Sequence, residues 1–555
     1  MSAARSNGSV RVVFLGGLGE VGRNMMAIDA AGRILVIDCG LSFPNEEMLG
    51  VDLVLPDFTW VVERADRVEA VLLTHGHEDH VGALSWFLQQ VDAPIYGTPL
   101  TLGIAGRRLS EFDVKADMRA VTAPGSLELG PFKCRFFTVS HSIPDAMAVV
   151  LDTPEGRIFY TGDFKLDPSP IDGRHTDLEG LAAIGREGVD LMLSDSTNAE
   201  TPGRTPSESI VGDALRDVFA GSSGRIIVAC FASNLHRIQQ VCELSEANDR
   251  KVAFVGRSML ANADVGQELG HLRVDPKTIV ELDKIEQYRP EEITIICTGS
   301  QGEPLSALSL IASGEHKQIR LRSNDTVILS ASPIPGNESA VHRVLNEVYR
   351  VGADVYHSGI ARVHVSGHAA SEELQEMAAL IRPRHLVPVH GEYRQLATHR
   401  KLAEAVGFAS DQITIVEDGD TLELRNGVTI SGERVQAGMV LVDGLGVGDV
   451  GPVVLRDRKH LAEDGILICV VTIDAQSGEL LAGPDLISRG FVHIDESREL
   501  LEDATDRVQE ALEALEAEHV TDWGAIKKVC RRSLGEFVWH ETRRRPVILP
   551  VIQEV

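Results

Sequence analysis

The sequence predicts an α/β protein of several domains. A chain of 555 residues is too long for a single hydrophobic core, so about three domains are expected. Strand-like runs alternate with amphipathic helical patterns, as where RIIVAC (225–230) and KVAFVG (251–256) flank NLHRIQQVCELSEA (234–247). The content of 43% hydrophobic and 24% charged residues is typical of a globular protein.

The cysteine pattern indicates a reducing compartment, and the short apolar runs indicate that no segment spans a membrane. The seven cysteines are odd in number and show no CxxC pair, which argues against a disulfide framework or a thiolate zinc site. The N-terminal segment is polar, and no apolar run approaches the roughly 18 residues of a membrane span. We therefore expect buried, reduced cysteines, no membrane segment and a cytoplasmic location.

The charge balance restricts how a nucleic acid could bind. The formal net charge is −29, the reverse of what nonspecific attraction to phosphates requires. Any nucleic acid would need a local attractor, and bound metal ions could supply it.

The stretch FLGGLGEVGRN (14–24) carries Gly17, Gly19 and Gly22 in the GxGxxG spacing of dinucleotide sites. Such a site needs a helix after the last glycine. The following residues, NMMAIDAAGRILVID, instead form two short β-prone runs around Gly32. A hairpin is therefore predicted, in which the glycines allow close backbone packing.

The run AVLLTHGHEDHVGAL (70–84) places His75, His77, Asp79 and His80 after an apolar strand and just before a helix. Imidazoles and a carboxylate at this density suit two borderline-soft divalent ions, with zinc favoured. A single histidine after a strand is usually an ordinary core or surface residue. Four potential ligands within six residues indicate a metal site.

These residues match the His-x-His-x-Asp-His motif, and the sequence thus resembles the metallo-β-lactamase superfamily. The early aspartate of that superfamily matches Asp38 in IDCG, its third motif His141 in TVSHSIPDA, and its fourth motif Asp163 in FYTGDFK. About two hundred residues then intervene before HLVPVHGEYRQL, where His390 follows a strand. The intervening segment reads as a second α/β domain.

This layout resembles the β-CASP nucleases, with Asp195 in SDST as motif A, His368 in VSGHA as motif B and His390 as motif C. The sequence is most similar to bacterial ribonuclease J, which it matches in the following segments: FASN (231–234), CTGSQGEPLSAL (297–308), SPIPGNE (332–338), HVSGHA (364–369) and SRGFV (488–492). The resemblance implies an αββα sandwich with an inserted β-CASP α/β domain and a small α+β C-terminal domain. The expected boundaries are 1–205 and 371–443 for the sandwich, 206–370 for the β-CASP domain, 444–459 for a glycine-rich linker and 460–555 for the C-terminal domain.

The resemblance also assigns the metal ligands. One ion would be held by His75, His77, His141 and Asp163, and the other by Asp79, His80, His390 and the shared Asp163. Two Zn²⁺ are expected, with Mn²⁺ as a tolerated substitute. Two such ions can hold a bridging hydroxide and stabilise both the attacking oxygen and the phosphoryl group.

Three residues are expected to act in catalysis: Asp79, Asp195 and His368. We hypothesise that His368, oriented by Asp195, protonates the leaving 3′ oxygen, because a carboxylate partner favours the charged imidazole. The alternative is that His368 only hydrogen-bonds a phosphate. The products would be a 5′ phosphate and a 3′ hydroxyl.

Two segments are candidates for binding RNA phosphates. In the first, a strand runs into Thr298, Gly299 and Ser300 before a helix, an arrangement in which main-chain N–H groups can converge on phosphate. A plain strand-to-helix turn is the alternative, and the lysine of a P-loop is absent. In the second, resemblance assigns His364, Ser366, Gly367 and His368 to a 5′-monophosphate pocket, which implies 5′-to-3′ exonuclease action.

The sequence therefore predicts a ribonuclease with exonuclease and endonuclease activity on single-stranded RNA, in mRNA decay and rRNA maturation. Three alternatives remain: a small-molecule metallohydrolase, a nonenzymatic RNA-binding scaffold, and a β-CASP nuclease acting on DNA. The C-terminal segment predicts a strand, a long amphipathic helix over 498–519 and a terminal strand, and the resemblance implies that this domain supports a homodimer or homotetramer. An RNA-degradation complex is a further expected partner.

Overall fold

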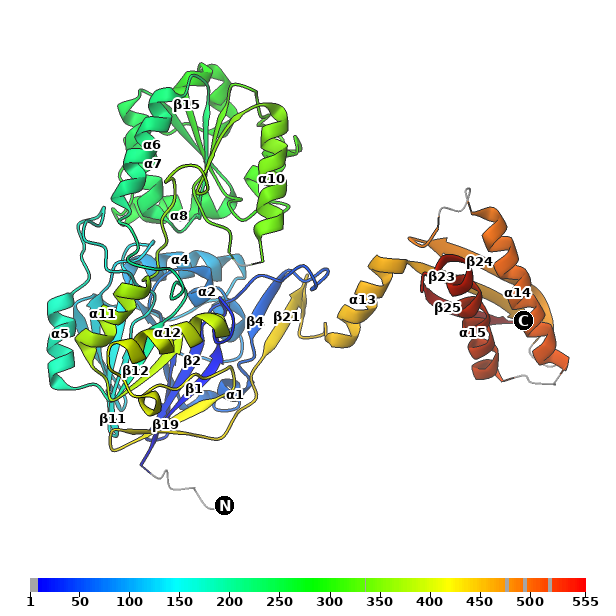
Figure 1. Ribbon diagram of the computed structural model, residues 1–555, viewed down its shortest axis with the longest axis horizontal. Helices are drawn as coiled ribbons and strands as arrows, with labels where there is room; N and C mark the ends of the chain where they lie inside the picture. Colours follow the sequence, from blue (N-terminus) through cyan, green and yellow to red (C-terminus); the bar gives the residue numbers. More distant parts are fainter. Residues whose placement is uncertain (1–7, 335, 475–478, 493–496, 518–521) are drawn as a thin grey trace. The chain divides into compact units, whose positions relative to one another are not determined.

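The computed structural model describes residues 8–334, 336–474, 479–492, 497–517 and 522–555. The chain forms two compact units (Figure 1). The larger unit contains Leu53–Val440 and the chain before Pro44, and the smaller contains Pro44–Asp52 and Leu441–Val555.

An eight-stranded sheet forms the first layer of the larger unit, in the order β20-β19-β1-β2-β3-β5-β6-β7. β1 pairs with β2 and β2 with β3, all antiparallel, and Gly32 makes the second turn with φ +82°. The prediction of a hairpin after the glycine-rich stretch is thus confirmed. The strands are β1 (Val10–Gly16), β2 (Met25–Ala30), β3 (Arg33–Ile37), β5 (Val68–Leu72), β6 (Ile95–Gly97), β7 (Met118–Ala120), β19 (Thr421–Arg425) and β20 (Val428–Ser431).

A six-stranded sheet forms the second layer, in the order β18-β12-β11-β10-β9-β8. β11, β12 and β18 are parallel, whereas β8, β9 and β10 pair antiparallel. Apolar side chains of both sheets, such as Val12, Leu72, Phe136 and Leu193, form one buried core between them. The strands are β8 (Gly125–Leu129), β9 (Phe132–Thr138), β10 (Met147–Thr153), β11 (Gly156–Tyr160), β12 (Leu191–Asp195) and β18 (His385–Val389).

Helices cover the outer face of the second sheet, where Leu181 of α5 and Leu374 of α11 pack against Phe159 and Met192. α11 is adjacent to both α5 and α12 (Figure 1). The helices of this part are α1 (Thr59–Val62), α2 (Glu78–Val81), α3 (Leu84–Phe87), α4 (Pro99–Glu111), α5 (Leu178–Glu187), α11 (Ser371–Ile381) and α12 (Tyr393–Ala405), with the short strand β4 (Leu53–Pro56).

The inserted lobe is a fully parallel five-stranded sheet in the order β14-β15-β13-β16-β17. Residues alternate between its two faces, so that Ile226 and Val228 pack with α6, α7 and α8, whereas Ile227 and Ala229 pack with α9 and α10. The elements are α6 (Ser209–Gly221), β13 (Ile226–Ala229), α7 (Leu235–Ala247), β14 (Lys251–Val255), α8 (Arg257–Glu268), β15 (Ile293–Cys297), α9 (Ala307–Ala312), β16 (Thr326–Leu329), α10 (Glu338–Val351) and β17 (Asp354–His357).

In the smaller unit, a sheet in the order β24-β23-β25 packs against α14 and α15. Val508 and Leu512 of α14 are buried in this core, as the amphipathic pattern predicts, and residues 518 and 519 of that pattern lie outside the described residues. The elements are β21 (Met439–Asp443), β22 (Gly446–Val447), α13 (Pro452–Asp464), β23 (Ile466–Ile473), β24 (Leu480–Arg489), α14 (Arg498–Ala517), α15 (Trp523–Thr542) and β25 (Val547–Glu554).

The expected linker 444–459 is only partly a loop. Its four glycines precede Pro452, where α13 begins with proline in its first turn. No residue of α13 is buried, so the apolar periodicity that usually reveals a helix is missing from this segment.

The seven cysteines are all buried and free, as expected. Within the described ranges, no helix is both long enough and apolar enough to cross a membrane.

Candidate metal centre

The candidate site lies where strands of both sheets end. Asp38 follows β3, and His75 follows the parallel strand β5. In the second sheet the parallel strands β11, β12 and β18 lead to Asp163, Asp195 and His390 respectively. Because parallel strands end at the same edge of a sheet, residues far apart in sequence are brought together there.

A first group of ligand atoms comes from His75, His77, His141 and Asp163, with one atom from each residue and all of them within 4.8 Å of one another. The Nδ1 atom of His77 lies 3.1 Å from both His75 Nε2 and His141 Nε2. Asp163 Oδ2 lies 3.5 Å from His75 Nε2 and 3.8 Å from His141 Nε2. The four atoms thus surround one small volume, as ligands of a common ion do.

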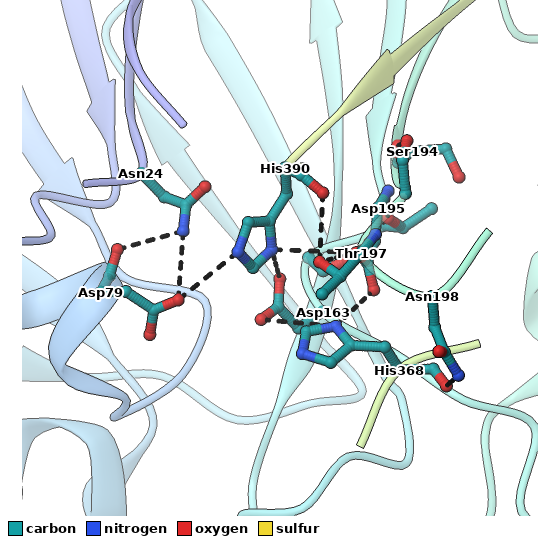
Figure 2. Close-up of polar contacts among 12 residues, drawn as sticks. Asn24, Asp79, Asp163, Ser194, Asp195, Thr197, Asn198, His368 and His390 are labelled. Carbon is teal, nitrogen blue, oxygen red and sulfur yellow. Dashed lines mark hydrogen bonds and ion pairs between the residues drawn. The ribbon is translucent and has the colours of Figure 1, made fainter. Parts of the chain in front are cut away.

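A second group, within the same 4.8 Å limit, consists of Asp79, His80, His390 and again Asp163. Asp163 Oδ2 lies 3.2 Å from His80 Nε2, and Asp79 Oδ2 lies 3.4 Å from His390 Nε2. The carboxylate of Asp163 therefore belongs to both groups. Figure 2 shows it beside His390.

Two residues of the candidate site, Asp38 and His390, have a left-handed backbone conformation. Asp38 has φ +58° and His390 has φ +53°, a conformation that costs a non-glycine residue of order 1 kcal/mol and persists only where surrounding contacts fix it. A close approach also occurs at Gly40, where a Cβ atom would lie 1.6 Å from the carbonyl oxygen of Asp79. Gly40 thus lets the loop after β3 pack directly on the motif that carries Asp79 and His80.

Hydrogen bonds from outside the two groups orient the imidazoles. His80 Nδ1 donates to Asp38 Oδ2 over 2.8 Å, and Asp38 Oδ1 in turn accepts from the amide of Thr74 over 2.8 Å. His141 Nδ1 donates to the carbonyl of Gly367 over 2.8 Å. In both histidines Nε2 is left as the nitrogen that faces the cluster.

Protonation differs between the two groups for a clear physical reason. Burial lowers the pKa of His75 and His141 well below the ordinary value and that of His77 to about 4. Burial opposes charge on His80 as well, but Asp163, Asp38 and Asp79 outweigh it and raise the pKa of His80 well above the ordinary value. The histidines of the first group thus present neutral nitrogen lone pairs, whereas the carboxylates around the second group favour positive charge at His80 and His390.

This arrangement fits divalent cations. The imidazole Nε2 of His390 is buried, makes no hydrogen bond to any residue that the structure describes and lies 3.4 Å from Asp79 Oδ2. Buried carboxylates call for positive charge, and neutral imidazoles supply ligands for it. Histidine and carboxylate ligands without thiolate favour zinc and also accept manganese.

A histidine–aspartate pair adjoins the cluster. His368 Nδ1 donates to Asp195 Oδ2 over 2.8 Å, and the amide and hydroxyl of Thr197 donate to Asp195 Oδ1 over 3.0 and 2.9 Å (Figure 2). The side-chain amide of Asn198 donates to the carbonyl of His368, and the Thr197 Oγ1 atom also lies 3.1 Å from the carbonyl oxygen of His390. The turn after β12 therefore holds both histidines in place.

Asn24 is a site residue that sequence reasoning did not single out. Its Nδ2 atom lies 3.4 Å from Asp79 Oδ2 and 3.1 Å from His80 Nε2, and it donates to the carbonyl of Asp79 over 3.2 Å (Figure 2). A Cβ atom at Gly17 would lie 2.3 Å from Asn24 Oδ1. The first glycine of the GxGxxG spacing thus makes room for the amide that contacts the cluster.

The predicted phosphate-binding residues fall into two separate sets. Ser366 and Gly367 adjoin the cluster, through the 3.1 Å bond from His368 N to Ser366 Oγ and through the contact of Gly367 with His141. Thr298, Gly299 and Ser300 follow β15, and no hydrogen bond within the described part of the chain joins them to 364–368. The helix α9 begins only at Ala307. Burial and Arg237 lower the pKa of His364 to about 3, so His364 is neutral.

Family comparisons match almost the whole chain. Residues 18–203 match the metallo-β-lactamase superfamily, and 352–415 match the Zn-dependent metallo-hydrolase RNA specificity domain. Residues 223–348 match the ribonuclease J β-CASP domain, and 453–555 match the ribonuclease J C-terminal domain. Ribonuclease J2 of Bacillus subtilis is 42% identical over 550 residues, covering 99% of both chains. The chain belongs to the ribonuclease J family.

Other relatives agree with this assignment. Ribonuclease J of Mycobacterium tuberculosis is 43% identical over 551 residues, which cover 99% of this chain and 98% of the relative. A solved structure of a protein of unknown function from Enterococcus faecalis covers 76% of this chain and 100% of its own, with TM-score 0.52 and 15% identity. The latter supports the fold alone.

The predicted family and fold class are confirmed: a metallo-β-lactamase fold with a β-CASP insertion and a ribonuclease J C-terminal domain. The histidine and aspartate cluster of this fold is a divalent-metal site.

Proposed function

We propose that the chain is a ribonuclease that degrades single-stranded RNA from a 5′-monophosphorylated end, 5′ to 3′, and also cuts internally. Membership of the ribonuclease J family makes the chain a hydrolase of the ribonuclease class. The observation that carries the finer proposal is the shared carboxylate of Asp163, next to the His368–Asp195 pair. The contact between this pair and the ligand cluster supports a role for His368 as proton donor.

The metal ions are proposed to be two Zn²⁺, replaceable by Mn²⁺. When bound, they would supply positive charge that acidifies a water molecule and neutralises phosphoryl oxygens. One ion would be held by His75, His77, His141 and Asp163. The other would be held by Asp79, His80, His390 and again Asp163. The outer partners Asp38 and Asn24 would keep these ligands oriented.

His368 is proposed to protonate the leaving group. A water molecule loses one proton to the solvent, and its oxygen forms a bond to phosphorus. The bond from phosphorus to O3′ breaks, and the electron pair left on O3′ takes the proton of His368. Because Nδ1 is engaged by Asp195, Nε2 is the nitrogen that can carry this proton. Burial opposes charge on the ring, but Asp195 outweighs it and raises the pKa of His368. The products are a 5′ phosphate and a 3′ hydroxyl.

The 5′-monophosphate pocket is proposed to consist of His364, Ser366, Gly367 and His368, with Thr298, Gly299 and Ser300 binding the RNA backbone further along. The position of Ser366 and Gly367 directly beside His141 and His368 supports the first assignment. His364 would act as a neutral hydrogen-bonding group, since its Nδ1 is buried without a partner. An end held this close to the cluster would be cleaved one nucleotide at a time.

Assembly and location complete the proposal. We propose a cytoplasmic homodimer or homotetramer that participates in an RNA-degradation complex in mRNA decay and rRNA maturation. Ile468 pairs with Ile487 on one side and with Leu549 on the other, and the last two are 40% and 42% exposed. This apolar row across the C-terminal sheet supports self-association. Light scattering after size exclusion measures the oligomer directly.

The test compares the products of RNA, a DNA of the same sequence and a nitrocefin or thioester substrate, with Zn²⁺ or Mn²⁺ and after chelation. The Asp79→Ala/His80→Ala variant is the control for a contaminating nuclease. Metal-dependent cleavage of RNA alone supports the proposal. Equal cleavage of DNA would favour the DNA nuclease, and turnover of only the small substrates would favour the small-molecule hydrolase.

A further inference from the structure

One helix of this acidic protein is basic. Residues 523–545, which include α15 and the turn after it, contain seven Lys and Arg against two Glu, a net charge of +5 in a chain whose total is −29. The neighbouring helix α14 carries Glu and Asp at seven of its 20 positions. Positive charge is therefore collected on a single element of the smaller unit.

The charged residues of α15 combine with aromatic side chains in a regular row. We define the α15 row as Trp523, Lys527, Arg531, Gly535, Trp539 and Arg543, which follow one another at intervals of four residues. Side chains at this interval are neighbours on a helix surface, about 6 Å apart along its axis. Ile526, Cys530, Leu534 and Val538 each precede a member of the row by one position, about 100° around the helix, and are buried against the sheet, so the row flanks the buried face.

Both tryptophans and both arginines of the row are exposed to solvent, whereas Lys527 and Gly535 are half-buried. Trp523 and Trp539 are 45% and 37% exposed, whereas the other two tryptophans of the chain, Trp60 and Trp86, are buried. The indole nitrogen of Trp523 donates to Glu554 Oε1 over 2.5 Å, which holds this ring in place on the surface.

The cations of the row are not neutralised by the protein. Among the residues that the structure describes, no carboxylate lies within 4 Å of the charged nitrogens of Lys527, Arg531 or Arg543. Two of these cations instead lie over aromatic rings: Lys527 Nζ is 5.8 Å from the Trp523 ring, and Arg543 Cζ is 5.6 Å from the Trp539 ring. Their charge therefore remains available to an anion.

The turn after the helix adds to the row. Arg543 ends α15 in the left-handed conformation, with φ +58°, and this turn brings Arg545 Cζ to 4.4 Å from the Trp539 ring. Arg543 and Arg545 thus both lie against the exposed ring of Trp539, whereas Arg544 donates to the carbonyl of Phe491.

We propose that the α15 row binds the backbone and bases of single-stranded RNA, as a holding surface in addition to the cleavage site. Cations that bind phosphates and aromatic rings that stack on bases are the combination used for single strands without sequence preference. A polyanion is the partner that this concentration of positive charge fits. The inference rests on the proposed ribonuclease function, which supplies the RNA.

The test measures RNA affinity by fluorescence anisotropy, with a 30-nucleotide 5′-monophosphorylated RNA and the full chain carrying Asp79→Ala/His80→Ala, so that the RNA stays intact. The row variant is Lys527→Gln/Arg531→Gln/Arg543→Gln. A matched control is Arg216→Gln/Arg350→Gln/Arg400→Gln, which removes three exposed helix arginines that are already paired with carboxylates. Both variants change the net charge equally.

The row variant should bind the RNA about tenfold more weakly than the control, and its plot of log affinity against log salt should be shallower by about 2. In the otherwise unchanged chain, RNA should quench the tryptophan fluorescence, and Trp523→Phe/Trp539→Phe should lose this quenching. The second readout does not depend on how the triple variant folds.

Equal affinity and salt dependence of the row and control variants, or no quenching by RNA, would overturn the inference and leave the row to an acidic protein partner. Neither result bears on catalysis, which is measured on the chain with Asp79 and His80 intact. If that chain fails to cleave any RNA with its metals bound, the proposed function itself falls.

Discussion

His390 Nδ1 lies 2.8 Å from Asp163 Oδ1, although 227 residues separate the two in the sequence. The contact exists because β11 and β18 both run parallel to β12 and end at one edge of the sheet. Asp163 thereby touches both groups of ligand atoms, and the whole inserted lobe is accommodated between the two residues.

Asp163→Asn should therefore remove both metal ions together. The variant would lose the negative charge that both groups of ligands share. The rate of RNA cleavage should therefore fall by more than the 10- to 100-fold expected when a residue that only hydrogen-bonds a metal ligand is replaced. Elemental analysis of the purified variant measures the metal per chain, with the exposed Asp213→Asn as control. A variant that kept two ions per chain would contradict the shared-carboxylate arrangement.

Gly17→Ala should act on the metal cluster through Asn24. The added Cβ would collide with Asn24 Oδ1, and we expect the metal affinity to fall about 10- to 100-fold, as in Asn24→Ala. Gly19→Ala is the matched control, because its φ of +77° is similar but no atom lies within 4 Å of the added methyl group. Competition with a chelator measures the affinity.

Both glycine variants carry the backbone strain of about 1 kcal/mol that alanine has at positive φ. A decrease in metal affinity shared equally by Gly17→Ala and Gly19→Ala would show that strain alone is responsible.

His368→Ala should lower the cleavage rate of RNA about 10²- to 10⁴-fold while the metal content stays unchanged. A phosphodiester with a good leaving group, such as bis-p-nitrophenyl phosphate, needs no protonation and should be cleaved at nearly the normal rate. Equal losses on both substrates would favour the alternative role of His368 as a phosphate ligand.

The His368–Asp195 pair predicts a pH dependence of the cleavage rate. A proton donor must be charged, and its activity is lost as the pH rises through its pKa. Asp195 raises the pKa of His368 above the ordinary value, so Asp195→Asn should move the alkaline loss of activity to lower pH. A pH–rate profile for RNA cleavage checks the direction of this shift. An unmoved alkaline limb would mean that another group donates the proton.

Glu208 and Arg237 form a buried pair in the inserted lobe, with Arg237 Nε 2.7 Å from Glu208 Oε1 and a second contact of 3.0 Å from Nη2 to Oε2. Arg237→Ala would leave the Glu208 charge buried without its partner, at a cost of about 3–5 kcal/mol in the free energy of unfolding. Denaturant melts measure this cost, with the exposed Arg216→Ala as control. A loss under 1 kcal/mol would contradict it.

Stability should also fall in acid. Burial alone would raise the pKa of Glu208, but Arg237 outweighs it and lowers that pKa below the ordinary value of 4.5. The ionised Glu208 carboxylate therefore stabilises the folded state fully above the pKa that it has in the unfolded chain. This stabilisation is lost as the pH falls through the lower pKa of the folded state.

Much of the cluster could be predicted from short motifs. His75, His77, Asp79 and His80 lie within six residues, so the pattern is local and visible in the sequence. His141, Asp163 and His390 were expected from resemblance and the order of strand ends. Their convergence follows from strand pairings that span hundreds of residues.

Other features depend on contacts that no local pattern reveals. Asn24 contacts the cluster only because Gly17 leaves space and Gly40 allows the motif to approach. The neutral state of His364 results from burial beside Arg237, 127 positions away in the sequence. α13 buries no residue, so its sequence lacks the pattern of a packed helix, and the glycines before it predict a linker over 444–459. Pro335 of the SPIPGNE motif lies outside the described residues.

The most direct test of the central claim is the release of mononucleotides from matched RNAs that carry either a 5′ monophosphate or a 5′ triphosphate. Both are incubated with the metal-loaded chain, and the Asp79→Ala/His80→Ala variant serves as control. We predict rapid mononucleotide release from the monophosphorylated RNA, slow release from the triphosphorylated RNA and none with the variant. Internal cuts alone, at equal rates on both RNAs, would contradict an end-binding pocket beside the metal cluster.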